Sequence, residues 1–114
     1  MKTLWRRLFP LALILCGLAA TPASAATELP WAKVTMLTGG WTVPLLAVQT
    51  SATFSNPNSC PNTGLYVVPP DAASHQLFSS MLLTAYSRGD DVKLVIDGCS
   101  GWPVIIGIQI RPAA

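Results

Sequence analysis

The sequence predicts a small α+β fold: a mostly antiparallel five-stranded sheet, curled or closed into a barrel, with one helix between strands 3 and 4. Three observations support this prediction. Short segments rich in β-branched residues are separated by turn residues, as strands are. One segment alone has the 3.6-residue periodicity of a helix. That segment follows three strand segments and precedes two, so the helix can pack on the apolar side of the sheet.

The first two strands are predicted to form a hairpin. Residues 33–38 mix β-branched and apolar side chains, which is typical of a strand. Gly39 and Gly40 then indicate a turn, and residues 41–54 continue as extended chain. Pro44 cannot donate a hydrogen bond to a ladder, so it predicts an edge or a bulge at that point.

A loop and a short strand precede the helix. Residues 55–64 form the most turn-rich stretch of the chain, and residues 65–68 form the third strand. Pro69 and Pro70 end this strand because proline has no backbone N–H.

The helix is predicted over residues 72–88. Asp71 or Ser74 can cap its start, and Gly89 is suited to end it. Its apolar stripe has the spacing i, i+3, i+4 and consists of Leu77, Phe78, Met81, Leu82, Ala85 and Tyr86.

Two further strands complete the fold. Asp90 and Asp91 form a turn, residues 92–96 alternate as a strand, and residues 97–101 form a tight turn. Residues 104–111 make the clearest strand of the chain. One face of it is predicted to carry Val104, Ile106, Ile108 and Ile110, and the other Ile105, Gly107, Gln109 and Arg111. This order of elements fits a partly closed OB-like barrel, the oligonucleotide/oligosaccharide-binding arrangement, and a simple curled sheet crossed by the helix fits nearly as well.

Residues 1–25 are predicted to be a cleaved signal peptide, leaving residues 26–114 as one small domain. Three basic residues precede an apolar run, and Ala23-Ser24-Ala25 forms a small-x-small cleavage site. The run is too short for a confident membrane span, and no later segment is longer, so no stable span is expected after cleavage. Cys16 is interpreted as a small hydrophobe of this segment rather than a lipoprotein cysteine. The general secretory route is favoured over the twin-arginine route, and the location is predicted to be periplasmic or secreted, in a bacterium.

Cleavage leaves two cysteines, Cys60 and Cys99, which are predicted to form a disulfide in an oxidising compartment. Cleavage also changes the formal charge. The whole chain has a net charge of +2, but four basic and five acidic residues remain after residue 25. A net charge of −1 without a basic patch argues against nucleic-acid binding. Two cysteines and one histidine without C-x-x-C spacing do not form a metal site, and no cofactor motif is present.

A longer segment carries a resemblance. The run S-S-M-L-L-T-A-Y-S-R-G-D-D-V-K-L-V-I-D-G-C-S-G-W-P-V-I-I-G-I-Q-I resembles a pattern in small, uncharacterised secreted bacterial proteins. More weakly, the element order is similar to that of the B subunits of subtilase-cytotoxin and pertussis-like toxins. That similarity implies an OB-fold, pentamers and glycan binding, and no glycan-contact residue can be matched by position.

Aromatic side chains are the candidate ligand contacts. Trp31, Trp41 and Trp102 could stack on sugar rings or fill a pocket of a partner, or they could simply cover the ends of the barrel. His75 is the single histidine, without a catalytic constellation around it, so no enzyme is expected. The sequence therefore predicts an exported, non-enzymatic binding or assembly module for a glycan or a protein, with self-association open. The alternative is a structural or accessory cell-envelope protein without a small-molecule ligand.

Overall fold

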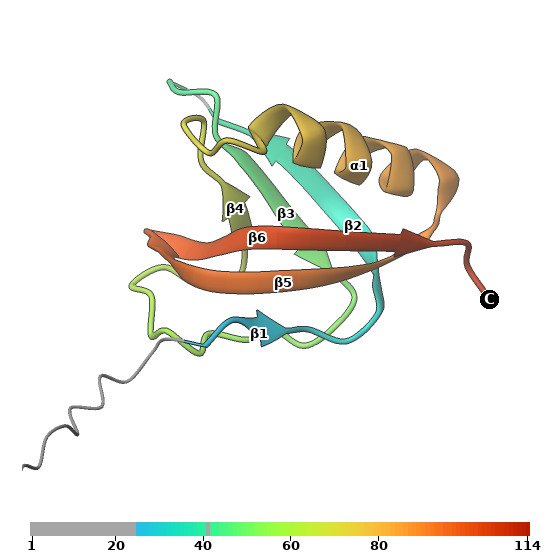
Figure 1. Ribbon diagram of the computed structural model, residues 1–114, viewed down its shortest axis with the longest axis horizontal. Coiled ribbons are helices and arrows are strands. Elements are labelled where there is room, and N and C mark those ends of the chain that lie inside the picture. The colour runs from blue at the N-terminus through green and yellow to red at the C-terminus, as the bar shows by residue number, and fades with distance from the viewer. Residues whose placement is uncertain (1–24, 41) are drawn as a thin grey trace, which may run out of the picture.

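The computed structural model describes residues 25–40 and 42–114, so the predicted signal peptide lies outside the described residues except for Ala25. Six strands and one helix make an α+β fold (Figure 1). In chain order they are β1 (Thr27–Glu28), β2 (Ala32–Gly39), β3 (Leu46–Thr50), β4 (Tyr66–Val68), α1 (His75–Arg88), β5 (Asp91–Ser100) and β6 (Trp102–Arg111).

The strands close into a ring, which decides between the two predicted arrangements in favour of the OB-like barrel. β2 pairs with β3, β3 with β4, β6 with β5, and β5 with β2, all antiparallel. The remaining link of the ring, β4 to β6, is parallel and joins Val67 to Val104. Helix α1 lies against one side of this barrel and contacts β2, β4 and β6 (Figure 1).

β1 and β2 behave as one interrupted strand. Thr27 pairs with Ile96 and Ala32 pairs with Val92, so both strands run along the same edge of β5. Pro30 lies between β1 and β2, where its missing N–H removes no hydrogen bond from the pairing with β5. The helix therefore stands between β4 and β5 by number. Within the five-membered ring it stands between the third and fourth members, as the sequence predicted.

The helix packs by a narrower stripe than its sequence pattern indicated. Phe78, Leu82 and Ala85 are buried, whereas Leu77 and Tyr86 are 59% and 49% exposed. Those two side chains lie on the flanks of the helix, beyond the width of the barrel surface that it covers. Gly89 ends the helix in the left-handed conformation and donates its N–H to the carbonyl of Ala85, as predicted.

A β-bulge overturns the predicted faces at Ile105 and Ile106, whereas Ile108 and Ile110 pack against the core as predicted. Val95 pairs with Gly107 and Ile96 with Ile105, so Ile106 is an extra residue without a partner on β5. The bulge turns the Ile106 side chain outward, to 48% exposure, and buries Ile105 at 2%. Strict alternation predicted the reverse, with Ile105 facing outward and Ile106 facing inward.

Two strand boundaries also differ from the prediction. The stretch 41–54 was predicted as extended; of its described part, residues 42–54, only Leu46–Thr50 forms a strand, and Pro44 lies in the preceding loop. β5 continues to Ser100, where a turn was predicted, because it pairs with β6 as far as the single turn residue Gly101.

The core lies inside the barrel and under the helix. The largest fully buried side chains of this core cluster are Leu82, Leu94, Ile96, Ile105, Val48, Val68 and Val92. No helix within residues 25–40 and 42–114 is long and apolar enough to cross a membrane.

Candidate functional site

The barrel separates the predicted tryptophans. Trp102 is the first residue of β6, whereas Trp31 directly precedes β2 and lies beside Arg111, the last residue of β6. Ten residues of extended chain span roughly 30 Å, so the two rings cannot contact one small ligand. Trp41 lies outside the described residues, and its predicted role stays a prediction.

The ring of Trp31 contacts two neighbouring cations. The guanidinium carbon of Arg111 lies 4.0 Å from the ring centroid, and the Lys93 ammonium lies 5.7 Å from it. Lys93 also forms an ion pair of 3.0 Å with Glu28 in β1. These contacts tie β1 and the residue before β2 to β5 and β6. We therefore assign Trp31 a structural contact and leave it out of the candidate site.

Trp102 forms a wall of a pocket of about 350 Å³. Its described lining consists of Thr38, Gly39, Gly40, Thr42, Val43, Leu45, Ala47, Leu65, Val67 and Trp102. The size is within the range of small-molecule sites. The pocket lies over β3 and β4, between the β2–β3 loop and the β5–β6 turn. On OB folds, the corresponding strands and loops hold the ligand.

The floor of this pocket is made by the outward face of β3 and β4. Ala47 pairs with Val67, and both are buried although neither packs in the core cluster inside the barrel. The loop before β3 contributes Thr42, Val43 and Leu45 to the lining of the same pocket. It turns tightly, because Leu45 donates its N–H to the Val43 carbonyl at 2.7 Å. A Cβ on Gly40 would collide with that same carbonyl, so glycine is required at this point of the loop.

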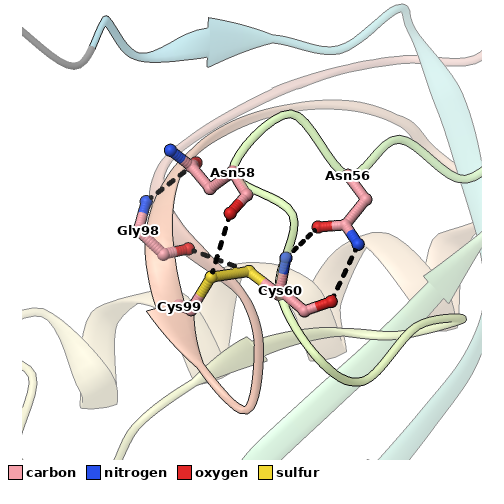
Figure 2. Close-up of a disulfide and its surroundings, with 5 residues drawn as sticks. All are labelled: Asn56, Asn58, Cys60, Gly98 and Cys99. Carbon is pink, nitrogen blue, oxygen red and sulfur yellow. Dashed lines mark hydrogen bonds between the residues drawn. A yellow bond between two sulfur atoms is a disulfide. The ribbon is translucent and has the colours of Figure 1, made fainter.

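A disulfide fixes the end of β5, the strand that precedes Trp102 in the chain, and Figure 2 shows the disulfide and its surroundings. Cys60 and Cys99 are joined with a Cα–Cα distance of 5.5 Å, as the sequence predicted. The Asn56 side chain accepts the N–H of Cys60 at 2.8 Å and donates to its carbonyl at 3.0 Å. The Asn58 side chain accepts the N–H of Gly98 at 3.1 Å. The loop over residues 55–64 is thereby fixed to the end of β5.

The same loop fixes the turn directly before Trp102. Asn62 donates its N–H to the carbonyl of Gly101 at 2.8 Å. Gly101 has a φ of +78°, a conformation that favours glycine. The covalent link at Cys99 therefore lies three residues before Trp102, and the hydrogen bond at Gly101 lies one residue before it. The turn before the indole is therefore held by the loop as well as by the pairing of β5 with β6.

A second hollow of about 230 Å³ lies where β3 ends and β4 begins. Gln49, Thr50, Ala52, Phe54, Gly64 and Tyr66 line it. Gln49 shares the outward face of β3 with Ala47, and Gly64 directly precedes Leu65. The Tyr66 hydroxyl accepts the Ser55 N–H at 2.9 Å and its ring stacks on Phe54, while burial raises the pKa of the phenol. The inner wall of this hollow is thus fixed.

Charge is absent from the described lining of both hollows. Seven of the nine charged residues from Ala25 onward gather at the other end of β5 and β6, joined by four ion pairs. We call this group the charged end, and its members are Glu28, Lys33, Arg88, Asp90, Asp91, Lys93 and Arg111. Within it, the hydrogen bond from Lys33 at 2.8 Å lowers the pKa of Asp91, and Arg111 adds to this effect.

His75 lies at a third hollow of about 270 Å³, between the β2–β3 loop and α1. Its Nδ1 is 3.0 Å from the Pro69 carbonyl, and Ser79 donates its hydroxyl hydrogen to the His75 carbonyl at 2.7 Å. Ser79 is thus engaged with the helix backbone, and no carboxylate lines this hollow among the described residues. Within the same part of the chain, no three His, Cys, Asp or Glu residues gather as a metal site would require.

Sequence reasoning named Trp102, which lines the candidate pocket, but did not name Gln49 or the pocket floor. The alternation of Ala47 and Gln49 around buried Val48 was a usable signal, because it gives the outward face of β3 an alanine where solvent-facing polar residues are usual. Comparisons with protein-family models, with curated proteins and with solved structures found no match to this chain.

Proposed function

We propose that this protein is an exported, non-catalytic binding module that holds an uncharged ligand in the Trp102 pocket. The pocket itself carries the proposal: an indole wall, two threonine hydroxyls and an apolar floor, without an ionisable group in its described lining. An uncharged group that offers an apolar face to Trp102 suits this lining, since a buried charge would lack a partner. Export is supported by the predicted signal peptide and by the Cys60–Cys99 disulfide.

A binding role is better supported than a catalytic one. His75 and Ser79 line the same hollow, but the Ser79 hydroxyl donates to backbone. Neither residue lines the Trp102 pocket. Acid–base or nucleophilic catalysis requires groups that contact the bound substrate, and these two side chains do not line the proposed binding pocket.

The alternative is an accessory cell-envelope protein without a small ligand, whose uncharged end is covered by another protein chain. The gathering of charge at the opposite end favours this reading, because protein interfaces have few charged residues at their centre. In that case Trp102 would contact protein, and the free protein would self-associate or capture a partner.

The test compares two tryptophans in the oxidised protein without residues 1–25. Trp102→Ala and Trp31→Ala are each screened on a glycan array, with the wild type, and the leading ligands are titrated by calorimetry. We expect Trp102→Ala to lower the affinity about tenfold or more, as truncation of a central aromatic contact does. Trp31→Ala is the matched control and should leave the affinity unchanged.

Equal losses for the two variants would refute the assignment of the Trp102 pocket as the binding site. Light scattering on the same samples tests the alternative. An oligomer that dissociates on Trp102→Ala, without any ligand on the array, would favour the accessory-protein reading.

A further inference from the structure

We infer that export processing completes the fold: hydrolysis of the peptide bond between Ala25 and Ala26 creates an ammonium group that pairs with the Asp97 carboxylate on β5. This inference rests on export, which is part of the proposed function, and it adds a role for the new N-terminus. It is carried by the register of β1 on β5, because β1 begins directly after the predicted cleavage site.

The register of the two strands brings Ala26 opposite Asp97. Thr27 pairs with Ile96 in an antiparallel ladder. One step toward the N-terminus on β1 is one step toward the C-terminus on β5, so Ala26 comes beside Asp97, although the strand itself begins at Thr27. Directly opposed residues of antiparallel chains have Cα atoms roughly 4.5–5.5 Å apart. An ammonium on Ala26 therefore has the Asp97 carboxylate within reach.

The hydrogen-bond pattern of the ladder leaves the Ala26 nitrogen out of the strand pairing. Leu29 donates its N–H to the Leu94 carbonyl at 2.8 Å, so these two opposed residues form a hydrogen-bonded pair. Bonded and non-bonded pairs alternate along antiparallel strands. Thr27 is therefore in the next bonded pair, and the position of Ala26 and Asp97 is a non-bonded one, where side chains lie closest. The ammonium can turn toward the carboxylate without breaking the ladder.

The neighbouring position on the same face already holds a cross-strand ion pair. Ile96 is buried in the core, so the side chain of Asp97, the next residue, is directed outward. Glu28 is the following outward residue of β1, and its carboxylate lies 3.0 Å from the Lys93 ammonium on β5. An ammonium on Ala26 repeats this contact with the charges exchanged between the strands. Opposite charges that face each other across two strands stabilise their pairing.

The charge arises only when the peptide bond is hydrolysed. Water breaks the C–N bond: its oxygen joins the Ala25 carbonyl carbon as a carboxylate, and its protons go to the Ala26 nitrogen, which changes from a neutral amide to an ammonium. Ala25 and Ala26 are exposed and precede the strand, so a peptidase can reach this bond. Hydrolysis one bond later would remove Ala26 and place the ammonium on Thr27, whose nitrogen belongs to the ladder.

The experiment compares a chain that begins at Ala26 with one that begins at Ser24, each with and without Asp97→Asn. The two added residues move the ammonium roughly 7 Å along an extended chain. Asp97→Asn should lower the Tm of the Ala26 chain by about 2–5 °C more than that of the Ser24 chain, as an exposed ion pair does in a domain of this size. High salt should reduce the difference. Other contacts of Asp97 are common to both chains and cancel.

Asp71→Asn is the matched control, because Asp71 is an acidic residue that precedes α1 and lies outside the β1–β5 ladder. It should change the Tm of both chains equally. If Asp97→Asn also acts equally on both chains, the ion pair is refuted and export stands. N-terminal sequencing of the full chain expressed in a bacterium should find Ala26 first. A start at Thr27 refutes the ion pair alone, whereas retention of residues 1–25 refutes this inference and export together.

Discussion

A tryptophan lies at each end of β6, and the two rings have opposite surroundings. At the charged end, Arg111 and Lys93 stand over the ring of Trp31, and ion pairs surround it. At the other end, Trp102 borders an open pocket without a charge in its described lining. Neighbours, and not residue type, therefore decide whether a tryptophan fastens the fold or is available to a ligand.

The two ends are also closed by different interactions. Ion pairs and cation–π contacts, each weak in water, link β1, β2, β5 and β6 at the charged end. A disulfide and backbone hydrogen bonds fix the end with Trp102. The disulfide and the backbone hydrogen bonds keep their geometry without any charged group. The wall of the pocket that carries Trp102 is therefore both rigid and uncharged.

The largest expected effect comes from removing the disulfide. The double substitution Cys60→Ser and Cys99→Ser should lower the free energy of unfolding by about 4 kcal/mol, because the loop that the disulfide closes spans 39 residues. Guanidinium unfolding measures this loss, and wild type in reductant is the control. Hydrogen exchange should show that residues 98–103 lose protection before residues 91–95. If protection from exchange is lost uniformly along β5 and β6, the two ends of these strands are not held by separate interactions.

The next largest effect compares two glycines with positive φ, one at each end. Gly101→Ala and Gly89→Ala should each cost about 1–2 kcal/mol of stability, since both residues are left-handed. Gly101→Ala should cost more, because its Cβ would lie 3.0 Å from Nδ2 of Asn62, whereas the Gly89 position is open. Thermal unfolding measures both. Only Gly101→Ala should weaken ligand binding; equal effects on binding would show that the turn does not position Trp102.

A smaller effect tests the contact of Trp31 with Arg111. A double-mutant cycle with Trp31→Ala and Arg111→Ala should give a coupling energy of about 0.5–1 kcal/mol, which decreases in high salt. The pair Trp102 and Arg111 serves as the control and should be additive, because these residues lie at opposite ends of β6. Coupling within error of zero for Trp31 would remove its structural role.

The smallest effect is the acid dependence at Asp91. Its pKa is lowered in the folded protein, first by the Lys33 hydrogen bond. The ionised carboxylate therefore stabilises the fold above the unfolded pKa of about 3.9, and this contribution is lost as the pH falls through the lower folded pKa. Asp91→Asn should flatten the decline of stability with acid, as measured by unfolding between pH 5 and pH 2 (roughly, the range of carboxyl titration). Lys33→Gln should flatten it too, and an unchanged slope in both variants would contradict the assignment.

Much of the fold could be predicted because its signals are local. The spacing of Phe78, Leu82 and Ala85 indicates a helix, and Gly89 ends it, whatever the rest of the chain does. The bulge at Ile106 could not be predicted, since an extra residue is defined only against the partner strand. The same holds for the pocket: its walls come from residues as distant as Thr38 and Trp102.

The sequence by itself determined the types of the elements, the disulfide between Cys60 and Cys99 and the scarcity of charge, because each depends on neighbouring residues or on composition. Tertiary structure alone decided that the barrel closes, that the charges gather at one end and that Trp102 faces a pocket. Ring closure brings together strands separated along the chain, and its register sets which side chains meet. That register has no local signal, so the site emerges only when the barrel has formed.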